Sequence, residues 1–269
     1  MSKIRIACQT YTWEMLGSGW QGSVISILDW ISQAGYVGIE ITNTMIGEFA
    51  HSPEEFRKEL DRRGLVLAAF GYARTGFSDP ASWDADIAGV EQAIEFVRQF
   101  PEPRLALGGA FSPHGKEGRN RLSTAIRFYN EAGRLCSAAG VSVNVHPTSH
   151  HGSLIETASE YQFLVDGLDP DLVSLGPDTG HIVRGNQDLL TCLRNYLPRI
   201  SHLHLKDVTA SGAWTALGQG ICDFPAIRDL LESGCYAGWV VAEEESPEAR
   251  EDGVAAIQKN RAFLKSIGL

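Results

Sequence analysis

Short apolar runs alternate with longer, helix-like stretches from one end of the chain to the other. Alternation of this kind is typical of βαβ units, in which a helix connects each strand to a parallel neighbour. Eight such units predict a single α/β domain over residues 1–269, a (β/α)8 TIM barrel. An open, doubly wound sheet shows the same alternation and remains an alternative. The predicted strands are 3–9, 37–42, 65–70, 103–108, 141–146, 172–177, 200–205 and 237–243.

Signals for helix ends separate these runs. A Ser or Thr before a helix caps its free N–H groups, a proline fits the first position, and a glutamate three residues after the cap completes a capping box. Apolar residues recur at steps of three and four over 118–139, which predicts a helix there. The predicted helix starts are Ser52-Pro53 with Glu55, Thr157 with Glu160, and Ser246-Pro247 before the last helix.

Composition narrows the classes of function. The formal net charge of −10 would repel nucleic acid and acidic membrane surfaces, and no Lys/Arg cluster offsets it. The five cysteines are odd in number and form no C-x-x-C pair, so neither a disulfide framework nor a thiolate zinc site is expected. The start lacks the pattern of a secretory signal, and no run of about eighteen apolar residues occurs. We therefore expect a cytoplasmic protein with no nucleic-acid or membrane partner.

Polar side chains stand at the ends of the four late strands, although a buried parallel strand should be apolar there. In a barrel, the carboxyl ends of all strands meet at one mouth, so these residues are expected to converge. Gathered carboxylates and imidazoles predict one divalent cation in a mixed nitrogen and oxygen site, with Mn²⁺ favoured and Co²⁺, Mg²⁺ or Zn²⁺ as alternatives. The residues are Asn144 and His146, Asp178 and His181, His202, His204 and Lys206, and Glu243.

Several motifs around these residues are informative together. They are GPDTGH, HLHLKD, Leu217-Gly218-Gln219-Gly220 with Asp223-Phe224, GWVVAEE, and GYVGIEI with Glu40. In these motifs the whole chain resembles the xylose isomerase-like barrel superfamily of sugar isomerases, ketose 3-epimerases, myo-inosose dehydratases and endonuclease IV, and is most similar to the inosose dehydratase-like members. The resemblance implies a TIM barrel enzyme with a small sugar or polyol substrate and a bound divalent metal ion.

The resemblance also implies a set of metal ligands. The Asp on strand six, the His on strand seven and the Glu on strand eight of the ketose 3-epimerases correspond to Asp178, His204 and Glu243. On strand five, those relatives have Glu where this chain has Asn144, and the segment HPTSHHGSLIET instead resembles the H-P-H-x-G-T segment of inosose dehydratases. His146 is therefore the predicted fourth ligand, with Asn144 as the contender.

The neutral amide of Asn144 cannot accept a proton, which disfavours epimerisation by two opposed bases. The chemistry that remains is a single-base reaction on a keto-sugar or keto-inositol, in which a base takes the α proton and an enediolate forms. Loss of a neighbouring hydroxyl then gives dehydration, and return of the proton at the next carbon gives isomerisation. The predicted catalytic residues are Glu243, Lys206, His150 and Glu156, and the predicted substrate contacts are His181, Asn144, Glu40 and Trp13.

Structural roles are alternatives for several of these residues. Core packing is an equal alternative for Trp13, a contact with a helix start for Glu156, and an ion pair with Asp207 or Glu243 for Lys206. The alternative functions are a sugar-binding barrel without catalysis, a subunit of a larger enzyme, and a nuclease of the endonuclease IV kind. The net charge of −10 disfavours the nuclease. Formation of a homo-oligomer remains open.

Overall fold

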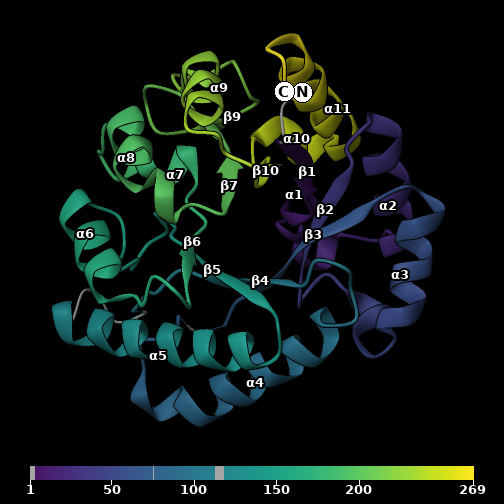
Figure 1. The fold of residues 1–269 in the computed structure, drawn as a ribbon. Coiled ribbons are helices and arrows are strands. Elements are labelled where there is room, and N and C mark those ends of the chain that lie inside the picture. Colours follow the sequence, from purple (N-terminus) through teal and green to yellow (C-terminus); the bar gives the residue numbers. More distant parts are fainter. Residues whose placement is uncertain (1–3, 75, 113–117) are drawn as a thin grey trace.

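A computed structural model describes residues 4–74, 76–112 and 118–269. Within them, eight parallel strands form one sheet in the order β6-β5-β4-β3-β2-β1-β10-β7 (Figure 1). Each predicted strand range overlaps one of these strands, and Lys3, at the start of the first range, lies outside the described residues. The strands are β1 (Arg5–Gln9), β2 (Gly38–Thr42), β3 (Val66–Tyr72), β4 (Arg104–Gly108), β5 (Ser142–His146), β6 (Ser174–Leu175), β7 (His202–Leu205) and β10 (Trp239–Ala242).

The two ends of the sheet, β6 and β7, meet and close it into a barrel. Parallel bridges join Leu175 to Ile200 and Asp178 to His204. The backbone N–H of His204 donates to the carbonyl of Pro177 at 2.9 Å across this seam. The edge strands of an open, doubly wound sheet do not meet in this way. The barrel prediction is therefore confirmed.

Helices surround the barrel because each buries an apolar stripe against the outer face of the strands. Figure 1 shows them as an outer ring around the sheet. A small hairpin of β8 (Asp207–Val208) and β9 (Trp214–Thr215) follows β7. None of the described helices has the length and apolar character needed to cross a membrane. The helices are α1 (Tyr11–Glu14), α2 (Val24–Ala34), α3 (Pro53–Arg62), α4 (Trp83–Val97), α5 (Gly118–Ala138), α6 (Ala158–Gly167), α7 (Thr179–Arg184), α8 (Leu189–Tyr196), α9 (Phe224–Ser233), α10 (Pro247–Glu251) and α11 (Gly253–Ser266).

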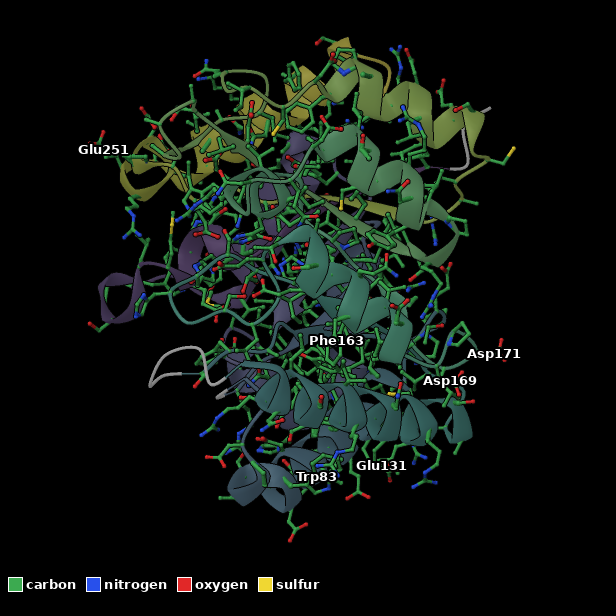
Figure 2. The ribbon with its side chains drawn as sticks, turned by 90° about the vertical axis from the view of Figure 1, so that its left-hand side faces the viewer. Trp83, Glu131, Phe163, Asp169, Asp171 and Glu251 are labelled. Atoms are coloured by element: carbon green, nitrogen blue, oxygen red, sulfur yellow. The ribbon has the colours of Figure 1, made fainter. Side chains whose placement is uncertain are left out.

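A side view distinguishes the two ends of the barrel. Glu251, in the helix that follows β10, lies at one end, whereas Asp169 and Asp171, just before β6, lie at the other (Figure 2). The first end is the mouth formed by the carboxyl ends of the strands. The predicted site residues follow β5, β6, β7 and β10, so they belong to this mouth.

The inside of the barrel is filled by small side chains around one large ring. Ala7, Ala68, Trp239 and Val241 form a buried cluster there. Gly38 makes room for the indole, because a Cβ at this position would lie 2.5 Å from the ring of Trp239. The inward face of β10 is thus apolar until the strand ends, and Glu243 follows in phase with Trp239 and Val241.

The predicted helix starts have three different outcomes. The capping box of Thr157 and Glu160 is formed at α6, as predicted. Ser52 precedes α3, but its side chain makes no capping hydrogen bond, so this part of the prediction is wrong. Ser246 caps α10, a short helix that is not the last one. The last helix, α11, is capped by Asp252.

Candidate metal centre and active site

Four side chains from four strand ends meet at the mouth of the barrel. His146 ends β5, Asp178 follows β6, His204 lies in β7 and Glu243 follows β10. One nitrogen or oxygen atom from each lies within 4.8 Å of the others. The first and the last of them, His146 and Glu243, are 97 positions apart in the chain, and closure of the barrel brings all four together. They are the four that the sequence predicts as ligands.

Asp178 uses one carboxylate oxygen and leaves the other without a partner. Its Oδ1 accepts the backbone N–H of His181 at 2.8 Å and so caps α7. Its Oδ2 is buried, and among the described residues it has no hydrogen-bond partner. The pKa of this carboxyl is raised to about 6, because burial and Glu243 raise it by more than Lys206 lowers it. A buried, unpaired carboxylate oxygen is costly and indicates that a positive charge belongs beside it.

The ring of His146 is oriented by the backbone. Its Nδ1 lies 2.9 Å from the carbonyl of Gly176, which can only accept, so Nδ1 carries the proton and Nε2 keeps its lone pair. Burial and the neighbouring His204 lower the pKa of His146 to about 3, which keeps the ring neutral. A neutral imidazole with a free Nε2 is suited to a metal ion.

His204 lies between two carboxylates. Its Nδ1 bonds to Oε2 of Glu243, and its Nε2 lies 3.1 Å from Oε2 of Glu40. Burial opposes a charge on this ring, yet Glu40 and Glu243 outweigh it and raise the pKa of His204 to about 10. In the protein without a metal, a proton thus occupies the position between His204 and Glu243.

The donor set fits a divalent cation. It combines two imidazole nitrogens with two carboxylate oxygens, the ligands that Zn²⁺, Mn²⁺ and Co²⁺ accept. Among the described residues, Oδ2 of Asp178 has no hydrogen-bond partner, and Nε2 of His146 keeps its lone pair. Asn144, whose amide oxygen is also buried with no hydrogen-bond partner among the described residues, stays the contender for the strand-five position.

Lys206 is buried against this cluster. Its Nζ donates to Oε1 of Glu243 at 2.6 Å and also bonds to Glu245. The ammonium lies 4.8 Å from the ring centre of Trp214 and 3.4 Å from Nε2 of His181. Burial opposes the charge, but Glu243 and Glu245 hold the pKa of Lys206 above its usual range. Of the two ion pairs predicted for Lys206, the one with Glu243 is present.

His150 and His181 form the side of the site next to Lys206. Nδ1 of His181 accepts the backbone N–H of Ser149 at 2.9 Å, and burial and Lys206 lower the pKa of His181 well below its usual value. The rings of His150 and His181 are 5.0 Å apart, and both lie near Glu245. His150 itself is exposed. His150, which is predicted to be catalytic, and His181, which is predicted to contact the substrate, therefore lie on the side of Lys206.

Asn144 and Glu156, two further predicted residues, differ in their placement. Asn144 is fully buried, and among the described residues neither atom of its amide has a hydrogen-bond partner. Glu156 lies before α6, where its backbone N–H donates to Glu160 and its carbonyl accepts from Gln187. Both contacts are made by the backbone of Glu156, so the catalytic role predicted for its side chain stays a prediction.

Glu40 and Trp13, two predicted substrate contacts, are both buried. Glu40 is 2% exposed, and its carboxylate accepts from Gln9 and two histidines of β7. Trp13 is also 2% exposed, and its ring packs on those of Trp20 and Trp30 at 6.2 and 5.7 Å. This burial among aromatic rings favours the core alternative for Trp13.

Three residues at this mouth are absent from the prediction. Glu245 holds Lys206, Trp214 covers it, and Ser149 orients His181. Trp214 also carries the guanidinium of Arg184 over its ring at 4.3 Å. A carboxylate two residues after Glu243 was the one signal in the sequence that could have indicated Glu245.

The closed barrel and the ionisable cluster at its mouth define a (β/α)8 barrel of the kind that carries an active site at the carboxyl ends of its strands. Comparison with known proteins narrows this class. The family model described as xylose isomerase-like TIM barrel matches residues 28–267. The chain therefore belongs to the xylose isomerase-like TIM barrel family, and it is an enzyme.

Individual relatives agree with this assignment. The chain is 26% identical to the inosose dehydratase of Halalkalibacterium halodurans, over 96% of this chain and 95% of that protein. The crystal structure of the IolI protein with a bound zinc atom has a TM-score of 0.84 and 16% identity, covering 98% of this chain and 97% of that one. The structure of an L-ribulose 3-epimerase has a TM-score of 0.75 and 20% identity, covering 99% and 94%. The two structural similarities concern the fold.

Proposed function

We propose that the protein is a metal-dependent lyase that removes water from a keto-polyol, meaning a keto-sugar or a keto-inositol. The observation that carries this proposal is the cluster of two histidines and two carboxylates at the mouth, with Lys206 held against it. The similarity over nearly the whole chain to an inosose dehydratase supports the choice of dehydration.

The metal would be held by His146, Asp178, His204 and Glu243. A divalent ion bound there would supply Lewis-acid polarisation of the substrate carbonyl, which makes the neighbouring C–H more acidic. The zinc in the related IolI structure supports Zn²⁺ as one occupant, and Mn²⁺ stays the predicted native ion.

The proton transfers are assigned to residues on one side of the site. His150 accepts the α proton, because partial desolvation of its ring and the nearby charge of Lys206 lower its pKa and favour the neutral form. The ammonium of Lys206 stabilises the negative charge that develops on the substrate oxygen. The protonated His150 then donates to the neighbouring hydroxyl, which leaves as water. The resulting enol becomes a 1,2-diketone, so atoms and charge balance without another reagent.

Isomerisation is the second candidate, because the same base could return the proton to the next carbon. The structural similarity to an L-ribulose 3-epimerase supports isomerisation as the second candidate. Asn144 weighs against epimerisation by two bases, since its neutral amide replaces the carboxylate that such a reaction needs on strand five.

A product assay separates the two candidates. Protein freed of metal with a chelator and reloaded with Mn²⁺, Co²⁺ or Zn²⁺ is incubated with neutral ketoses and inososes. A 1,2-diketone product is trapped by o-phenylenediamine as a quinoxaline, whereas an isomerised sugar is found by chromatography. We expect metal-dependent quinoxaline formation. Isomer without diketone would replace the lyase proposal, and no turnover of any substrate with any metal would contradict both.

Glu243→Gln tests whether the cluster is the metal site. Loss of the charge removes a ligand and an acceptor of Lys206, so metal content and turnover should fall together. The matched control is Glu244→Gln, because Glu244 is buried beside it but bonds to the backbone of Ser246 and to Asn260. Unchanged metal content in Glu243→Gln would remove Glu243 from the ligand set.

A further inference from the structure

A second group of ionisable side chains lies on the other side of His204 from Glu243. Glu40 accepts from Nε2 of His204 at 3.1 Å and from Nε2 of His202 with the same oxygen, Oε2. Its other oxygen, Oε1, accepts from Nε2 of Gln9 at 2.8 Å. Glu40 is 2% exposed, and His202 and His204 are no more exposed than that. The carboxylate is therefore fixed by three donors inside the barrel.

The two nitrogens of His204 face different partners. Nδ1 is the nitrogen beside Glu243 and thus the one directed at the cluster, whereas Nε2 is directed at Glu40. An imidazole can bind a metal through one nitrogen only if its proton is on the other. A carboxylate that accepts this proton in a hydrogen bond fixes the tautomer and makes the metal-binding nitrogen more basic.

We propose that Glu40 is a positioning residue that holds His204 with its proton on Nε2 and its Nδ1 free for a divalent cation. The proposal rests on the metal site described under the proposed function. It assigns Glu40 a role through His204 and no contact with the substrate, because three protein donors already occupy its buried carboxylate.

The hydrogen bonds around Glu40 favour this positioning role over a role in packing alone. Gln9 comes from β1 and His202 from β7, so donors from two different strands fix the direction of the carboxylate. A rigid acceptor transmits its orientation to the ring of His204, whereas a loosely held one would not. Nδ1 of His202 has no partner among the described residues, so His202 serves Glu40 alone.

Glu40→Gln is the central test, because it keeps the shape of the side chain and removes its charge. Affinity for Zn²⁺ is measured by competition with a chromophoric chelator, and folding by thermal unfolding of the metal-free protein. We expect the affinity to fall about 10- to 100-fold. Glu40→Asp, which keeps the charge, should retain more affinity than Glu40→Gln. An affinity of Glu40→Gln within twofold of the wild type would overturn the proposal.

Asp86→Asn is the matched control. Asp86 is 1% exposed, and it lies on α4, where it bonds to Ser82 and pairs with Arg74. The substitution makes the same chemical change in a buried carboxylate outside the cluster. Affinity for Zn²⁺ should stay within twofold of the wild type. An equal loss in Asp86→Asn and Glu40→Gln would show a general effect of buried charge and would overturn the proposal.

A measurement on the unaltered protein does not depend on the folding of any variant. In Zn²⁺-loaded protein labelled with ¹⁵N-histidine, long-range proton–nitrogen correlations report which ring nitrogen carries the proton. We expect His204 to be protonated on Nε2 and metal-bound through Nδ1. Metal on Nε2, or a second Zn²⁺ bound by Glu40, His202 and His204, would overturn the proposal.

The outcomes for Glu40 and for the metal site are separable. If the wild type takes up no Zn²⁺, Mn²⁺ or Co²⁺, the proposed function fails and the role of Glu40 fails with it. If the wild type binds metal and Glu40→Gln binds it equally well, only the role of Glu40 fails. Turnover is not needed for either conclusion.

Discussion

At the scale of single residues, Asp178 combines two tasks that a substitution can separate. In Asp178→Asn, the amide oxygen can still cap α7, because Asn is as good a cap as Asp. The position that faces the cluster is then taken by the amide NH2 group, which donates hydrogen bonds and does not bind a metal ion. We expect affinity for Zn²⁺ to fall more than the roughly 100-fold typical of changes outside the ligand shell. The free energy of unfolding of the metal-free protein should change by less than about 1 kcal/mol.

Asp188→Asn is the matched control, because Asp188 caps α8 in the same way by accepting the backbone N–H of Thr191 at 2.8 Å. It should affect neither stability nor metal binding. Chelator competition and urea unfolding check both variants. Retention of metal by Asp178→Asn would mean that Oδ2 of Asp178 is not a ligand.

A catalytic role of Lys206 can be separated from a structural one, because another lysine that pairs with two glutamates lies on the surface and serves as a control. Lys206→Met should lower turnover on the order of 100- to 1000-fold, since a preorganised cation beside the substrate oxygen is lost. Lys58, which pairs with Glu54 and Glu55 and has a 49% exposed side chain, provides the control Lys58→Met. The control should keep full turnover and leave the stability of the protein nearly unchanged, because exposed ion pairs contribute little.

The two variants are compared by steady-state kinetics at saturating metal. A Lys206→Met protein that stays folded and retains metal, yet turns over substrate at the wild-type rate, would contradict the catalytic role of Lys206. Thermal unfolding checks that the variant is folded.

Residue positions could be predicted only where the strand is regular. The two-residue period of β7 placed His202, His204 and Lys206 on one face, and the hydrogen bonds to Glu40 and Glu243 agree with it. Glu243 still follows the period of β10, although the strand ends at Ala242. One further step of two leads to Glu245, but the period of a strand does not predict a side-chain contact three residues beyond its end, and the contact of Glu245 with Lys206 is seen only in the structure.

At the scale of elements, the loop between β7 and α9 is organised around one carboxylate. Asp207 accepts the backbone N–H groups of Val208, Gly218, Gly220 and Cys222 at 2.8 to 3.1 Å. Gly218 and Gly220 thus lie in a turn that is fixed by this carboxylate. It also holds the hairpin that carries Trp214 over the site.

Asp207→Ala should therefore destabilise the protein by about 3 kcal/mol or more, because hydrogen bonds to a charged group each contribute about 1.5–3 kcal/mol. The comparison is Asp223→Ala, which removes a single capping bond from the start of α9. That change should cost about 1 kcal/mol. Urea unfolding measures both, and equal costs would contradict an organising role for Asp207.

Elements could be predicted where local signals agree with the tertiary structure. All eight strand ranges are apolar runs whose neighbours are helices, and the sheet requires such runs. The hairpin of β8 and β9 was missed because its strands are two residues each and carry no periodic pattern. The Ser246-Pro247 signal is a real helix start, but Asp252 begins another helix soon after, which a capping signal alone does not exclude.

At the scale of the whole molecule, the barrel closes through few backbone contacts at the seam between β6 and β7. β6 is two residues long, and it joins β7 through isolated bridges and not a continuous ladder. One bridge pairs Asp178 with His204, two proposed ligands of the metal. A bound ion would therefore join the two strands whose backbone pairing is weakest, and it would connect both to β5 and β10 through His146 and Glu243.

Metal binding should accordingly protect the seam more than the rest of the sheet. An ion at about 100 times its dissociation constant stabilises the bound state by about 2.7 kcal/mol, so amides that exchange by opening of the seam should slow about 100-fold. The N–H of His204, which bonds to Pro177, is the most direct reporter. Amides of β2 and β3 that exchange through local opening should change by less than about twofold, because neither strand carries a proposed ligand.

Hydrogen–deuterium exchange with and without Zn²⁺ measures this, with Asp178→Asn as the control that should show no slowing. Uniform slowing of all strands would mean that the seam does not open by itself, and no slowing at the seam would mean that no ion bridges β6 and β7.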